Sequence, residues 1–126
     1  MGKDKISKYD LGWVDDAITC LLDLTHIEIH SWKSFNQTKD KEWLEINDLA
    51  RKERTELLEK ICDKELLKKS ELWCFSKHSL RVIGSYIELG NRSYTKGNLE
   101  EAIFYFDKAS TWLGIFLIKN NLKTSA

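Results

Sequence analysis

Two histidines and an aspartate between residues 23 and 30 have the type and spacing needed to hold a metal ion. Asp23, His26 and His30 follow one another at intervals of three and four residues, so a helix would project all three from one face. Imidazole and carboxylate groups arranged in this way bind zinc and other transition metals. The alternative is a solvated polar stripe that contains two histidines. The HExxH zinc-protease motif is absent, because Glu28 lies between the histidines and points to the opposite side.

Glu28 is unusual because the helical projection places its carboxylate within the apolar face of the same helix. An unpaired carboxylate in that position would cost several kcal/mol or would take up a proton. Asn47 and Arg54 interrupt the facing apolar stripe of the next helix. We therefore expect a buried contact of Glu28 with Asn47 or Arg54 that fixes the register of the two helices. The other interpretation, a di-metal carboxylate site, requires a Glu-x-x-His pair, which the sequence lacks.

Catalytic motifs are not found elsewhere in the chain. Cys74 and His78 are four residues apart and Cys62 lies upstream, but this spacing is not that of a zinc finger or zinc ribbon. The sequence contains no glycine-rich phosphate loop and no GxSxG elbow. We therefore expect a non-enzymatic protein without a cofactor, in which Cys20, Cys62 and Cys74 are free thiols.

Composition favours a single globular domain in the cytoplasm. The chain has 126 residues, of which 20 are basic and 20 acidic, so no overall field attracts nucleic acid or an acidic membrane. An odd number of cysteines without a framework spacing fits a reducing compartment. The N-terminus has no apolar signal segment, and the longest uncharged run, Ala109 to Ile118, is too short to cross a bilayer. We expect no membrane contact. Contact with RNA is the weaker alternative, because Lys64, Lys68, Lys69, Lys77 and Arg81 could form a local basic patch but alternate with acidic residues.

Helices are the elements that must position these residues. The sequence has no proline and few glycines, which favours long uninterrupted helices. Hydrophobic periodicity and capping residues predict four helices, over 10–35, 41–62, 71–95 and 98–120. Residues 1–9 are expected to be flexible, and 63–70 fit either a helix extension or a turn. Short connections between the helices predict an all-α antiparallel four-helix bundle that forms one domain over 1–126.

The last two predicted helices share a pattern of large and small residues with a known repeat. Small residues allow close helix approach and large ones fill the remaining space. The pattern comprises Tyr86, Leu89, Gly90, Tyr94, Ala102, Phe106 and Ala109, with Gly97-Asn98 at the turn. Residues 83–116 therefore resemble one tetratricopeptide repeat (TPR). The closing proline and a second clear copy are missing, so the resemblance implies a single TPR-like hairpin and no peptide-binding groove.

The two helices of this hairpin carry more apolar surface than four helices bury among themselves. Exposed apolar patches usually mark contacts with another protein. The predicted contact residues are Trp73, Phe75, Val82, Tyr86, Trp112, Ile115 and Ile118. We therefore predict a protein that acts through protein–protein contact, as a homo-oligomer and preferably a dimer. The alternative is a metal- or ligand-binding helical protein that uses Asp23, His26 and His30.

Overall fold

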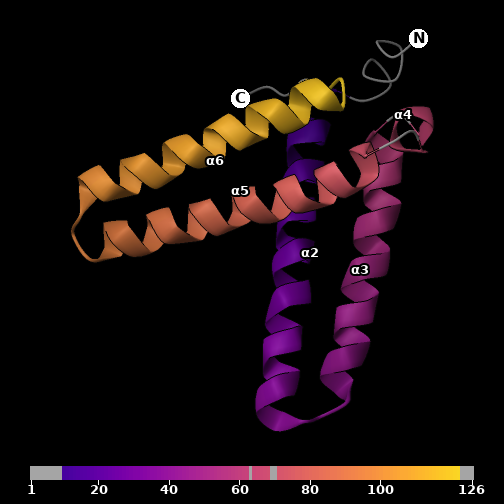
Figure 1. Cartoon of the computed structure of the whole chain (residues 1–126), viewed down its shortest axis with the longest axis horizontal. Coiled ribbons are helices and arrows are strands. Elements are labelled where there is room, and N and C mark those ends of the chain that lie inside the picture. The colour runs from indigo at the N-terminus through magenta and orange to yellow at the C-terminus, as the bar shows by residue number, and fades with distance from the viewer. Residues whose placement is uncertain (1–9, 63, 69–70, 123–126) are drawn as a thin grey trace.

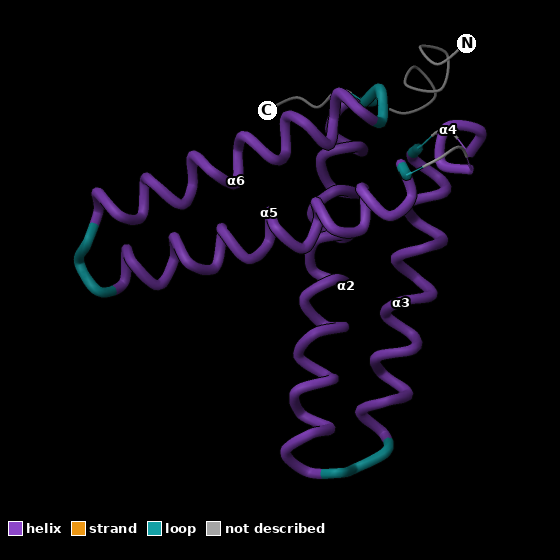
Figure 2. Tube along the Cα trace, viewed as in Figure 1, coloured by secondary structure: helices purple, strands orange, loops and turns teal. Residues whose placement is uncertain are grey.

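A computed structural model describes residues 10–62, 64–68 and 71–122 of the chain, and these residues are helical with short connections and no strand (Figure 2). The helices are α2 (Leu11–Thr38), α3 (Glu42–Ile61), α4 (Lys64–Lys68), α5 (Leu72–Thr95) and α6 (Leu99–Lys119). The predicted all-helical fold is confirmed. The predicted flexible segment 1–9 lies outside the described residues. Within 63–70, the structure places the short separate helix α4.

The four long helices form two antiparallel hairpins that cross (Figure 1). Helix α2 packs against α3, and α5 packs against α6. The hairpins meet mainly where α2 crosses α5. The turn end of each hairpin projects away from this crossing (Figure 1). The described residues therefore do not have the four aligned helices that the sequence suggested, because each hairpin pairs its own helices and only part of α2 reaches the second hairpin.

A glycine allows the two hairpins to approach closely. Gly84 is buried in α5, and the ring of His26 from α2 occupies the space that a Cβ at Gly84 would need. Any larger residue at this position would displace the imidazole or separate the helices. His26 therefore packs between the hairpins instead of facing solvent.

The hydrophobic core lies around the crossing and uses all four long helices. Its largest fully buried apolar side chains are Val14, Leu21, Leu58, Ile61, Leu80, Ile83 and Phe116, and Leu67 of α4 adjoins them. Burying a side chain of this size contributes roughly 1.5–3 kcal/mol relative to exposure. At its edge, the buried Asn120 Nδ2 donates to Ser76 Oγ at 3.0 Å, which connects the end of α6 to the beginning of α5.

Local sequence signals set the beginnings of α2 and α6. Asp10 caps α2 by accepting a hydrogen bond from the Trp13 backbone N–H at 2.7 Å. Asn98 caps α6 in the same way through the Glu101 N–H at 3.0 Å. Gly97 precedes it with φ of +83°, the left-handed conformation that glycine adopts most readily. These caps satisfy backbone donors that a helix leaves unpaired at its first turn.

Candidate functional site

The surface predicted for self-association is largely part of the fold itself. Trp73, Tyr86 and Trp112 are half-buried and pack against the core. The remaining half-buried members of the predicted set are Phe75, Val82 and Ile115. Only Ile118 is fully available to a partner, because 79% of its surface is exposed. The predicted stripe is therefore used mainly for packing within the chain.

Exposed apolar side chains gather instead on the two hairpins. In the first hairpin they are Leu11, Ile27, Trp32, Leu44, Ile46 and Leu49. In the second hairpin they are Leu89, Tyr94, Leu99, Ile103, Phe104 and, near the end of α6, Ile118, and we call the first five the second-arm apolar set. All five lie in the half of the second hairpin that carries its turn, which projects from the crossing (Figure 1). Two helices that pack only against each other leave their remaining apolar faces uncovered.

The interior of the second hairpin is closely packed by small residues and rings. A Cβ at Gly90 would overlap the ring of Phe106, and Ala102 and Ala109 are buried beside it. Nearer the crossing, the rings of Tyr86 and Tyr105 stack with their centroids 6.1 Å apart. The two helices therefore pack tightly against each other, and the exposed apolar side chains project from a rigid pair.

A buried polar cluster around Glu28 joins three helices. Arg54 Nη2 of α3 donates to Glu28 Oε1 at 3.1 Å, so the contact expected between these residues is present. Asn47 Nδ2 donates to the Glu28 backbone carbonyl at 2.7 Å. Arg81 Nη2 of α5 donates to Glu28 Oε2 at 2.6 Å, an ion pair that the sequence did not reveal. One carboxylate therefore holds the first hairpin together and ties it to the second.

This cluster contains more positive charge than its carboxylate neutralises. Arg54 is only 3% exposed, and its Nε and Nη1 atoms, like Nε of Arg81, are buried without a hydrogen-bond partner among the described residues. Burial lowers the pKa of the Arg54 guanidinium, the charge of Glu28 opposes this shift, and the charge of Arg81 adds to it. An arginine remains charged despite such a shift. The cluster therefore has a surplus cation and unused donors at the junction of the hairpins.

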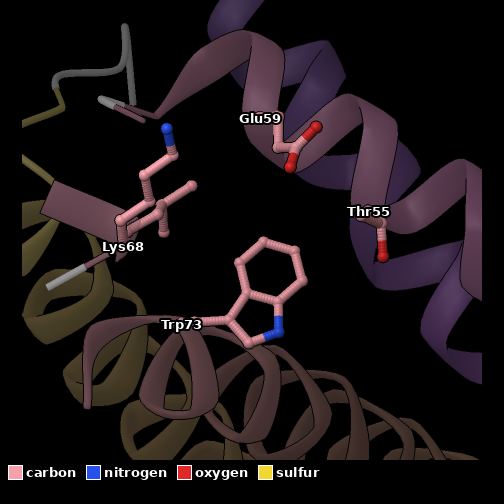
Figure 3. A pocket seen from close by; sticks show the side chains of 5 residues that line it. Thr55, Glu59, Lys68 and Trp73 are labelled. Atoms are coloured by element: carbon pink, nitrogen blue, oxygen red, sulfur yellow. The ribbon is translucent and has the colours of Figure 1, made fainter. Parts of the chain in front are cut away.

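Three adjoining hollows lie beside this cluster along α3 and α5, and α4 also borders the first of them and α2 the third. Figure 3 shows the first, in which Trp73 points into the space between Thr55 and Glu59 of α3 and Lys68 of α4. The second hollow shares Thr55 and Trp73 with the first. The third shares Arg51 and Lys77 with the second and reaches Glu28 and Arg81. The hollows thus form one groove, and we call the part made of the second and third hollows its basic end.

The proposed metal ligands on α2 do not come together as a site. Asp23 and His30 are exposed, whereas His26 is half-buried against Gly84. Within the described ranges, no group of three or more histidine, cysteine or acidic side chains could hold a metal ion. The structure therefore does not bring Asp23, His26 and His30 together as one group, because the packing at the crossing turns the imidazole of His26 toward α5.

No disulfide joins any of the three cysteines, all of which lie among the described residues. Cys62 is buried, and Cys20 and Cys74 are exposed. His78, one helical turn from Cys74, is also exposed. A thiol nucleophile is activated by neighbouring positive charge or by an oriented base, and exposure alone supplies neither.

None of the described helices is long and apolar enough to span a lipid bilayer. Comparisons of the chain with family models, with curated proteins and with solved structures gave no match.

Proposed function

We propose that this protein is a non-enzymatic helical module that acts through protein–protein contact, by forming a homodimer through its second hairpin. The observation that carries the proposal is the second-arm apolar set, which lies outside the core on a projecting pair of helices. Leu99, Ile103 and Phe104 of this set are 59%, 48% and 53% exposed. Large apolar and aromatic side chains of this kind supply most of the binding energy at protein interfaces.

The likeness of the second hairpin to a tetratricopeptide repeat supports the same proposal. Its small residues Gly90, Ala102 and Ala109 are buried between the helices, and Phe106 fills the space beside Gly90. A repeat of this type stacks on a neighbour, because one unit does not bury its apolar faces alone. A second copy of the chain would supply that neighbour. The exposed thiols of Cys20 and Cys74 support a reducing, cytoplasmic location.

The proposal is tested by the mass of the protein in solution. We expect the unmodified chain to have twice the monomer mass of 14.8 kDa by light scattering. The double variant Leu99→Asp, Ile103→Asp should shift to the monomer mass while its helicity by circular dichroism is unchanged. Both side chains are exposed, so two new carboxylates disfavour apolar association without entering the core.

Thr111→Asp is the matched control. Thr111 is exposed on the same helix and lies outside the second-arm apolar set. Its substitution therefore adds a negative charge away from the proposed contact. It should leave the dimer mass intact. A monomeric unmodified chain at concentrations up to the millimolar range would overturn the proposal, as would a double variant that stays dimeric.

A further inference from the structure

The basic end of the groove between α3 and α5 has the charge of an anion site, although the whole chain is formally neutral. The second and third hollows are lined by five basic and three acidic side chains, an excess of two positive charges. Among the acids, Glu28 is bound by two arginines, and Asp48 pairs with Lys52 at 2.8 Å. The third acid, Glu56, is exposed and lines only the second hollow.

Buried donors behind the groove strengthen this charge. Arg54 lines the second hollow, is 3% exposed, and keeps Nε and Nη1 without a partner. Arg81 lines the third hollow with 31% of its side chain exposed, and its Nε is also unpartnered. Charges in such a partly desolvated setting are less screened than charges on an open surface. Arg51 and Lys77 line both hollows and bring two further cations within reach of the same ligand.

We infer that this groove binds a phosphate group, held by Arg51, Lys77 and Arg81 over the buried Glu28–Arg54 pair. A phosphate dianion matches the local excess of two positive charges, whereas a carboxylate would neutralise half of it. The guanidinium fork suits paired hydrogen bonds to phosphate oxygens, and an ammonium adds a point charge. The two hollows have volumes of about 420 and 480 Å³, within the range of small-molecule sites. Trp73 lines the second hollow and Trp32 lines the third, so the two indole rings flank the site.

The test is a titration of the full chain with inorganic phosphate, followed by tryptophan fluorescence, with sodium chloride at equal ionic strength as the reference. We expect a saturable change with phosphate that chloride does not produce. The variant Arg51→Gln, Lys77→Gln should weaken the binding at least about tenfold, because hydrogen bonds to charged groups are worth roughly 1.5–3 kcal/mol. If that variant loses helicity, Arg51→Gln alone serves instead, since Arg51 is exposed.

The matched control is Lys60→Gln, Arg92→Gln, which removes the same two charges from exposed positions of α3 and α5 outside the groove. It should bind phosphate like the unmodified chain. A second titration with adenosine monophosphate distinguishes the source: tighter binding than phosphate identifies an ester flanked by the tryptophans, and equal binding identifies the free ion. The inference is overturned if phosphate acts no differently from chloride. Equal weakening in the control, or undiminished binding in the groove variant, would overturn it too.

Discussion

At the scale of single residues, Glu28 is the side chain on which most of the polar interior depends. It accepts hydrogen bonds from Arg54 and Arg81 through different oxygens. We predict that Glu28→Gln lowers the free energy of unfolding by about 3 kcal/mol or more, because two neighbouring guanidiniums would lose their shared countercharge. Urea denaturation monitored by circular dichroism measures this change.

An exposed glutamate of α5 provides the comparison. Glu88→Gln changes the same functional groups without touching the cluster, and it should alter stability by no more than about 0.5 kcal/mol. Equal stabilities of Glu28→Gln and Glu88→Gln would show that the buried ion pairs make no net contribution.

Only part of this cluster was predictable from the sequence. Helical projection identifies a carboxylate on an apolar face, and Arg54 and Asn47 stand out because they break the stripe of the adjacent helix in the hairpin. Arg81 lies 53 residues from Glu28, on a different hairpin. Its partner depends on where two hairpins cross, and periodicity within one helix contains no information about that.

At the scale of helices, the boundaries were predictable wherever a cap is written in local sequence. The predicted segment 98–120 agrees closely with α6, because Asn98 and Gly97 are strong start and turn signals. The first helix ends three residues later than predicted, at Thr38. Lys39 adopts the left-handed conformation at φ of 60° and donates its N–H to the Phe35 carbonyl at 2.7 Å. A lysine is not a usual residue for this cap, so the local sequence does not indicate that the helix ends here.

Two glycines of the second hairpin should respond in opposite ways to the same substitution. Gly90→Ala should destabilise the protein by about 1–3 kcal/mol, because the new Cβ would overlap the Phe106 ring in a packed interior. Gly114→Ala should stabilise it by about 0.5–1 kcal/mol, because alanine favours the helix and nothing lies within 4 Å of the new Cβ. Thermal or urea unfolding of the two variants measures both signs.

A second substitution checks the cause assigned to Gly90. In the double variant Gly90→Ala, Phe106→Leu, a smaller side chain replaces the ring, which should remove the overlap. The double variant should therefore lose less stability than the sum of the losses of the two single variants. Additive losses would mean that Gly90 does not act through Phe106.

At the scale of the whole molecule, the packing of the hairpins was the least predictable feature. Each helix shows which face is apolar, but the same faces fit a bundle of aligned helices or two crossed hairpins. The contact of Gly84 with His26 and the pair of Arg81 with Glu28 select the crossing. Both contacts involve small or polar residues, so the hydrophobic pattern of the sequence does not reveal them. For the same reason, the surface predicted for assembly differs from the apolar surface that the structure exposes. Trp73 and Tyr86 of the predicted surface pack against the core.

A crossed arrangement predicts an uneven distribution of stability. The core side chains, such as Leu21, Leu80 and Phe116, lie around the crossing, whereas the turn end of the second hairpin has only its two helices. Local opening requires less free energy where fewer apolar contacts must break. Hydrogen exchange followed by mass spectrometry should therefore show slow exchange around the crossing and faster exchange over residues 89–104.

The same measurement links stability to the proposed dimer. If the second-arm apolar set lies in the contact between two chains, protection of residues 89–104 should rise as protein concentration increases, since association stabilises only the bound state. Protection around Leu21 and Phe116 should stay constant in the same samples. In the variant Leu99→Asp, Ile103→Asp, exchange over residues 89–104 should be fast at every concentration. Concentration-dependent protection confined to the first hairpin would instead move the contact surface to the exposed Trp32 and Leu49.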